Sequence, residues 1–237
     1  MTSQLASSAS RRQGRIPGSV PVVPRYLERV GLCRCAVFSP LAGPTWRIVR
    51  EGADDYCAYG DDDRLSVGLL RDTCKVGGCW RILARSAAGQ SPVWHMDFDI
   101  HTPPELIAAV TAVLASDATV PVEPRPYLRG NNLDDMGAVW QPLADAGWTI
   151  IFDEACYLAT SSDGVTTLTY APAYKGLHDL MHPEAWLLEV VPDPEGDPLW
   201  CAMFHESTPL HLIAAFTTAL VDPLPLSGEL CTVPAVM

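Results

Sequence analysis

Two stretches of this chain decide its fold, because one repeats the other. Residues 92–114 read PVWHMDFDIHTPPELIAAVTAVL, and residues 198–220 read PLWCAMFHESTPLHLIAAFTTAL. Compared at a fixed offset of 106, residues 92–117 and 198–223 are identical at 11 of 26 positions. Unrelated windows of ordinary composition would agree at about two positions. The chain therefore contains an internal duplication.

The duplication extends upstream of these stretches. PLAGPTW at 40–46 matches PLADAGW at 142–148 with an offset of 102, and Trp80 matches Trp186 with an offset of 106. A four-residue difference must lie between these landmarks, and we place it in one loop. That loop reads RDTCKVGG at 71–78 in the first copy and APAYKGLHDLMHPEA at 171–185 in the second.

Each copy contains short β-type runs separated by turn signals. GDDDR at 60–64 and SSDG at 161–164 are typical of turns. We therefore predict an α+β fold of two tandem repeats related by a pseudo-twofold axis, each an antiparallel meander of about four strands followed by one helix. The expected strands are WRIV (46–49), LSVGLL (65–70), CWRILA (79–84) and VWHMDF (93–98), then WTIIF (148–152), VTTLTY (165–170), AWLLEVV (185–191) and LWCAMF (199–204).

The helix that closes each repeat has a sharply specified start. Thr102 is expected to cap the free amides, Pro103 suits the first turn, and Glu105 completes a capping box. Apolar residues follow at helical spacing and form one stripe that can lie on the sheet. Thr208 and Pro209 repeat this start in the second copy.

The strand before each helix has two different faces, because side chains alternate along a strand. Trp94 and Phe98 share the face of the helix stripe, so core packing is favoured over a stacking platform for ligands. The opposite face is polar in the first copy and less polar in the second, which we expect the first copy to cover. The repeat signature is Trp94, Phe98, Thr102, Pro103, Trp200, Phe204, Thr208 and Pro209, and the two outer faces carry His95, Asp97, Asp99 and Cys201, Met203, His205.

The pattern W-x3-F-x3-TP-x2-LIAA, in a unit that also contains a turn such as SSDG before a strand, resembles the streptomycete domain of unknown function 317, also called the SPDY domain. The resemblance covers about residues 40–117 and 142–223. It implies two copies and an actinobacterial source. It implies no activity, cofactor or catalytic residue.

Charge is distributed unequally along the chain. Residues 1–129 carry 15 basic and 13 acidic side chains, whereas residues 130–237 carry 1 basic and 15 acidic. The second half is therefore either a solvated acidic surface or a docking face for a basic protein partner. It is a poor site for nucleic acid, because phosphates require cations.

Composition and segment lengths suggest the compartment and the domain limits. No apolar run approaches the roughly 18 residues that a membrane span needs. Without an export signal, the eight cysteines are expected to be reduced thiols in a cytoplasmic protein. We expect a disordered leader (1–24), a first repeat (25–117), a linker (118–141), a second repeat (142–223) and a C-terminal tail (224–237).

Two histidine clusters are the best candidates for chemistry. His178 and His182 are four apart, as in zinc hydrolases, but Pro183 follows at once. His95, Asp97 and Asp99 on one strand face offer an alternative set of metal ligands or an acid and base. The sequence contains no G-x-S-x-G, no P-loop and no dinucleotide fingerprint.

These observations favour a non-catalytic protein-interaction or regulatory module without a cofactor. Two alternatives stay open at this point. One is a metal-dependent hydrolase that uses either histidine cluster. The other is a nucleic-acid-binding protein that uses the basic leader and the first repeat.

Overall fold

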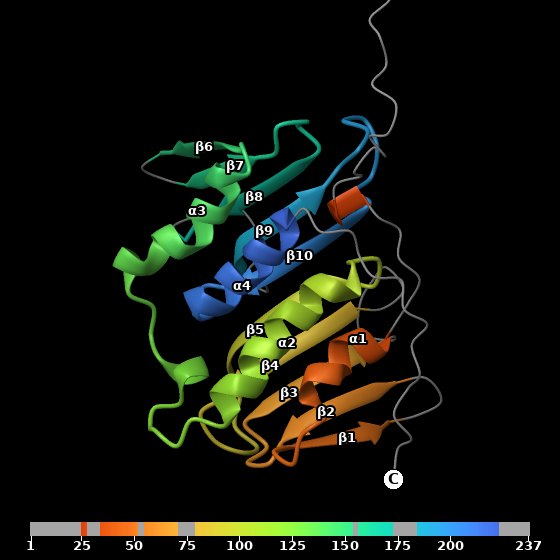
Figure 1. The fold of residues 1–237 in the computed structure, drawn as a ribbon, viewed down its shortest axis with the longest axis vertical. Coiled ribbons are helices and arrows are strands. Elements are labelled where there is room, and N and C mark those ends of the chain that lie inside the picture. Colours follow the sequence, from red (N-terminus) through yellow and green to blue (C-terminus); the bar gives the residue numbers. More distant parts are fainter. Residues whose placement is uncertain are drawn as a thin grey trace, which may run out of the picture.

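The computed structural model of the protein describes residues 25–27, 34–51, 55–70, 79–153, 156–172 and 184–222. Ten described strands form one antiparallel sheet, and the helices lie on one of its faces (Figure 1). The strands are β1 (Trp46–Arg50), β2 (Tyr56–Gly60), β3 (Leu65–Leu70), β4 (Cys79–Arg85), β5 (Pro92–Asp99), β6 (Thr149–Phe152), β7 (Tyr157–Thr160), β8 (Thr166–Tyr170), β9 (Glu184–Val190) and β10 (Trp200–His205). The α-helices are α1 (Arg34–Phe38), α2 (Pro104–Ala118), α3 (Gly137–Asp145) and α4 (Leu210–Val221).

The described residues also form four short 3-10 helices. They are η1 (Arg25–Leu27), η2 (Ser39–Leu41), η3 (Pro126–Leu128) and η4 (Leu133–Met136). The segment 118–141, which we predicted as a linker, contains η3, η4 and the start of α3. It therefore contributes to the folded unit.

The strand order is symmetric about the centre of the sheet. It runs β1-β2-β3-β4-β5-β10-β9-β8-β7-β6, so the last strands of the two copies pair with each other. Asp97 of β5 lies opposite Met203 of β10, and these two residues are equivalent at the offset of 106. Each copy therefore meets the other through the same positions of the same strand.

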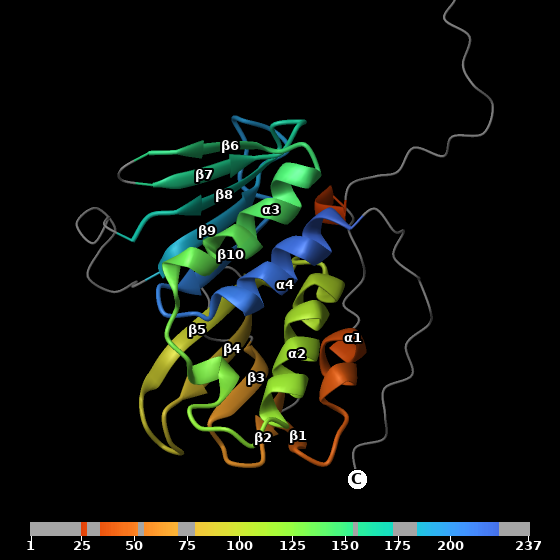
Figure 2. The same ribbon diagram turned by 60° about the vertical axis from the view of Figure 1, so that its left-hand side comes forward.

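Each copy has more elements than the sequence predicted. The meander has five strands rather than about four, because β2 and β7 are also present, and a short helix, α1 or α3, precedes it. The expectation that the first copy covers the outer face of β10 is wrong. The copies join side by side, and all four described α-helices lie on the other face of the sheet (Figure 2).

The core lies between the sheet and the helix layer. Trp94, Phe98, Trp200 and Phe204 are each at most 2% exposed. Phe98 and Phe204 meet across the junction of the two copies at a ring-centroid distance of 5.6 Å, and both contact Phe216 of α4. Burying aromatic side chains of this size stabilises the junction by a few kcal/mol per ring, at about 25 cal/mol per Å² of apolar surface.

The repeated Thr-Pro pair joins the two copies instead of capping its own helix. Neither α2 nor α4 has a side-chain cap, and Pro103 and Pro209 occupy the N-cap positions. Thr102 Oγ1 donates to the carbonyl of Cys201 at 3.5 Å, and Thr208 Oγ1 donates to the carbonyl of His95 at 3.2 Å. The predicted capping role of Thr102 is therefore wrong, because the partner copy offers its hydroxyl a carbonyl acceptor.

A second pair of equivalent threonines holds the first helix of each copy. Thr111 Oγ1 donates to the carbonyl of Val37 at 2.9 Å, and Thr217 Oγ1 donates to the carbonyl of Val139 at 3.1 Å. Both hydroxyls are buried, where an unpaired polar group is costly. The repeated threonines thus fix α1 on α2 and α3 on α4.

The segment at the start of each copy contacts the other copy. Tyr26, at the start of the first repeat, accepts at its carbonyl from Trp200 Nε1 at 3.0 Å and donates from its hydroxyl to Asp163 at 2.7 Å. Tyr127, which precedes the second copy, accepts at its carbonyl from Trp94 Nε1 at 2.7 Å. The two copies therefore exchange their leading segments.

The cysteines do not all have the state that the sequence suggested. Cys35 and Cys79 are disulfide-bonded, so the prediction that every cysteine is a reduced thiol is wrong. Cys57, Cys156 and Cys201 are free thiols. Burial is the main cause that raises the pKa of Cys57 and of Cys201, each to about 11.

Candidate functional site

The first candidate cluster lies on the sheet face opposite the helices. His95, Asp97 and Asp99 share that face of β5, as the alternation predicted. Arg81 binds Asp97 through two hydrogen bonds of 2.6 and 2.7 Å, and the ring of His95 lies 5.4 Å from that of His205. In the described part of the chain, no group of three His, Cys, Asp or Glu side chains is placed to hold a metal ion.

The second candidate cluster, His178 and His182, lies outside the described residues. The structure therefore places neither histidine. The basic leader, residues 1–24, also lies outside the described residues, as does the tail from residue 223.

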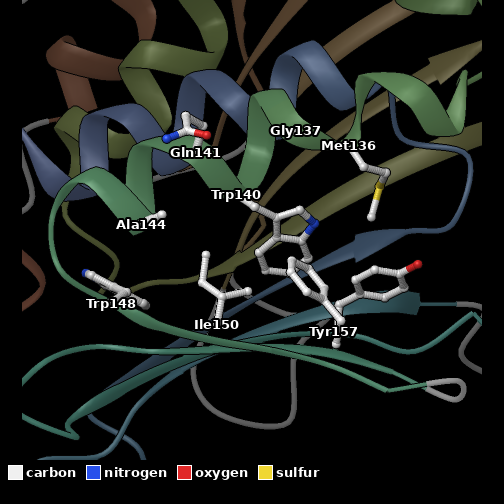
Figure 3. A pocket seen from close by; sticks show the side chains of 9 residues that line it. Met136, Gly137, Trp140, Gln141, Ala144, Trp148, Ile150 and Tyr157 are labelled. Carbon is white, nitrogen blue, oxygen red and sulfur yellow. The ribbon is translucent and has the colours of Figure 1, made fainter.

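The second copy has a groove beside α3. It has a volume of about 460 Å³ and lies between α3 and the strands β6 and β7. Figure 3 shows Trp140 projecting from α3 toward Ile150 and Tyr157, which rise from the sheet below it. The lining residues are Met136, Gly137, Trp140, Gln141, Ala144, Trp148, Ile150, Phe152 and Tyr157. We call this the α3 groove.

Aromatic rings form the floor of the α3 groove and continue into the core. Trp140 stacks on Tyr157 at 6.2 Å and on Trp186 at 5.5 Å, and Trp186 stacks on Tyr170 at 4.2 Å. Phe152 packs on Tyr157 at 5.2 Å yet remains 62% exposed. The inner rings fix the floor, and the outermost ring is offered to solvent.

Few polar groups point into the α3 groove. Gln141 donates to Asp145 at 2.7 Å, which holds its amide along the helix surface. The indole N–H of Trp140 is buried without a hydrogen-bond acceptor. The groove therefore offers mainly apolar surface, and its lining residues include none of the nucleophile and base pairs that hydrolysis requires.

Acidic residues flank the elements that line the α3 groove. Asp134 and Asp135 precede α3, Asp145 ends it, and Asp153 follows β6, all of them exposed. From residue 130 onward, the described part of the chain contains no lysine or arginine. The described residues of this copy therefore supply acidic but no basic side chains around the groove.

The family comparison concerns the strands and the closing helix of each copy. The sequence model of the SPDY domain of unknown function (DUF317) matches residues 55–120 and 160–226, which is more than half of the chain. The chain belongs to the SPDY (DUF317) family. Neither the comparison with curated proteins nor that with solved structures gives a match. None of the helices described is long and apolar enough to cross a membrane.

The α3 groove precedes the second SPDY segment in the sequence. Its lining residues run from Met136 to Tyr157, and that segment begins at residue 160. The family match therefore accounts for the shared core of the two SPDY copies and is silent on the groove. The residues that line the groove therefore lie outside both segments that the family model matches.

The first SPDY copy has different residues at the equivalent positions. At the offset of 102, Arg50 is equivalent to Phe152, and Arg47 is equivalent to Thr149. The guanidinium of Arg50 lies over the ring of Tyr56 at 5.8 Å, where the second copy has Phe152 against Tyr157. The first copy thus covers its outer aromatic ring with a cation, and the second leaves an apolar ring exposed.

Sequence reasoning missed the α3 groove, although a signal was present. Aligning WRIVR at 46–50 with WTIIF at 148–152 shows that both arginines of the first edge strand are lost in the second. Edge strands usually carry charges that discourage pairing with other chains. The loss of charge at one edge was therefore the readable sign of a docking surface.

Proposed function

We propose that the protein is a non-catalytic protein-interaction module that binds a partner in the α3 groove of its second copy. The observation that carries this proposal is an open aromatic groove with a solvent-exposed Phe152, in a half of the chain whose described residues carry acidic but no basic side chains from residue 130 onward. Exposed aromatic side chains next to buried ones are typical anchors of protein interfaces. The duplicated sheet serves as the rigid support.

A protein segment suits this groove better than a small metabolite. Sites for small molecules combine an apolar pocket with several precisely placed polar groups that fix orientation. Here Gln141 is engaged by Asp145, and the remaining lining is almost entirely apolar. Apolar side chains of a partner chain fit such a lining without further polar contacts.

The partner is expected to be basic. Four exposed aspartates flank α3 and β6, which line the groove, and the described residues of this copy supply no cation. Complementary charge raises association rates and excludes acidic competitors. A nucleic acid is disfavoured in this half, because its phosphates would meet the same carboxylates.

The remaining features of the proposal rest on the sequence. We propose a pseudo-twofold relation between repeats at 25–117 and 142–223, supported by the symmetric strand order and the paired threonine hydrogen bonds. A cytoplasmic location is also proposed, although the disulfide-bonded Cys35 and Cys79 remove the cysteine argument for it. The hydrolase and nucleic-acid hypotheses depend chiefly on residues outside the described ranges, and nothing described favours them.

The test is a selection of random peptides by the full-length protein. We expect enrichment of peptides that combine apolar residues with lysine or arginine. Their affinity should fall at least tenfold for Phe152→Ala, which removes an exposed ring, and should be unchanged for Val93→Ala, an exposed apolar residue of β5 away from the groove. Peptides that bind Phe152→Ala as tightly as the native protein would overturn the proposal.

A further inference from the structure

The free edge of β6 is the second unusual feature of this region. β6 is the last strand of the sheet: it pairs with β7 on one side, and no described strand pairs with its other side. Its residues are Thr149, Ile150, Ile151 and Phe152, none of them charged. Unpaired backbone groups at such an edge are a template for another strand.

The opposite edge of the sheet is protected. β1 carries Arg47 and Arg50, and Arg47 reaches Asp63 at 3.2 Å while it lies over the ring of Tyr59. By contrast, Ile151 is 55% exposed and Phe152 is 62% exposed, the two highest values for large apolar side chains in the described ranges. The edge strand β1 therefore carries two arginines, whereas the equivalent edge strand β6 has no charged residue and exposes Ile151 and Phe152.

The geometry of β6 connects this edge to the α3 groove. Ile150 and Phe152 line the groove, so they point toward α3, and Ile151 points to the opposite face. The backbone N–H of Asp153 donates to the carbonyl of Cys156 in the β6–β7 turn. By alternation, the N–H groups of Ile150 and Phe152 point away from β7. A strand added beside β6 would thus meet two donors and place every second side chain at the groove.

We infer that the partner binds by strand addition, as an extended peptide that pairs with β6, inserts alternate apolar side chains into the α3 groove and carries lysine or arginine at its ends. This inference rests on the proposed function and specifies its partner. The basic ends would lie near Asp153 and the carboxylates at the two ends of α3. Backbone pairing supplies affinity, and pockets for alternate side chains supply specificity.

A second copy of this chain is the less suitable occupant. Two β6 edges paired with each other would bring together two sets of the same exposed aspartates, and the described residues of the second copy add no cation between them. Like charges placed together at an interface oppose association. Charge therefore favours a basic peptide over self-association.

The probe is a nine-residue peptide of alternating valine and threonine with an arginine at each end. Binding is measured by calorimetry and by the fluorescence of Trp140 and Trp148, which line the groove. Two matched peptides serve as controls: one is N-methylated at alternate residues on a single edge, and one has glutamate in place of arginine. Phe152→Arg introduces at this position the residue that the first copy has, Arg50.

We expect the probe to bind, the methylated and the glutamate peptides to bind at least tenfold more weakly, and Phe152→Arg to lose binding. Affinity should also fall with salt, because exposed charges are screened. Equal binding of the methylated peptide, with loss in Phe152→Arg, would overturn strand addition and leave the groove as the interaction site. The inference would also be overturned if the probe did not bind. The same holds if the native protein formed a dimer that Phe152→Arg dissociates. By contrast, the proposed function itself would be overturned if the selection of random peptides failed.

Discussion

The hydrogen bond between Tyr26 and Asp163 gives the sharpest test of the exchanged leading segments. Tyr26 is 6% exposed, and its hydroxyl donates to Asp163 at 2.7 Å across 137 residues of sequence. Tyr26→Phe removes this donor and keeps the ring that packs edge-on against Trp148 at 6.3 Å. A hydrogen bond to a charged group contributes about 1.5–3 kcal/mol. Asp163 is exposed, so screening reduces the expected loss of unfolding free energy to about 1 kcal/mol.

The loss should depend on pH through the ionisation of Asp163. Partial burial raises the pKa of this carboxyl, but hydrogen bonds from Ser161, Tyr26 and the N–H of Val165 outweigh it, so the net pKa is lowered. A carboxyl with a lowered pKa stabilises the fold at pH values above its unfolded pKa of about 4. That stabilisation is lost as the pH falls through the folded pKa. The difference between the native protein and Tyr26→Phe should therefore be constant above about pH 5 and shrink below about pH 4.

The assay is urea unfolding followed by circular dichroism at several pH values, with Tyr59→Phe as the control. Tyr59 also donates to a carboxylate, Glu51, but on the exposed surface of one copy and only eight residues away. We expect its removal to cost less than about 0.5 kcal/mol. The reasoning would be refuted if Tyr26→Phe were as stable as the native protein at pH 7, or if its deficit were the same at pH 3.5 as at pH 7.

Three further predictions concern packing and thiol chemistry. Gly68→Ala should lose about 1–3 kcal/mol of stability, because its new Cβ would lie 2.8 Å from the sulfur of Cys57. Gly43→Ala is the control and should be neutral, because no atom lies within 4 Å of its new Cβ. Equal stability of the two variants in urea unfolding would contradict this prediction. Thr217→Val should lose about 1–2 kcal/mol by leaving the Val139 carbonyl without its side-chain donor, and a neutral result would contradict the buried bond. Burial raises the pKa of the Cys57 and Cys201 thiols to about 11. Both should therefore react with iodoacetamide at pH 8 at least tenfold more slowly than an exposed cysteine, as measured by mass spectrometry. Rapid labelling would contradict their buried positions.

The sequence predicted the elements whose signal is local and periodic. The helices after Thr102 and Thr208, the apolar face of β5 and the family were all readable from residues within one repeat. The strands β2 and β7 were missed, although β1 and β6, which are equally short, were predicted from their apolar runs after a tryptophan. The helix α1 was also missed, since it is barely one turn long.

Features that depend on contact between the copies could not be predicted from either copy alone. A threonine before a helix is expected to cap it, but at Thr102 a carbonyl of the other copy is the acceptor. The exchange of Tyr26 and Tyr127 likewise joins residues that are far apart in the sequence. The α3 groove could be recognised only by comparing the two copies. The informative difference is that the second copy has Phe152 at the position where the first has Arg50.

The pairing of β5 with β10 is the central claim, and a disulfide engineered across it tests that claim most directly. His95 and His205 lie directly beyond Met96 and Phe204, the last paired residues of the two strands, and their rings lie 5.4 Å apart. Cysteines at opposed positions of antiparallel strands lie within the range that a disulfide can bridge. We predict that His95→Cys/His205→Cys forms this bond within the monomer on mild oxidation, as read by peptide mapping. His95→Cys alone should not bridge to Cys201, about 13 Å away along β10. A failure of the double variant to form the bond, or a bond that forms only between chains, would contradict the account.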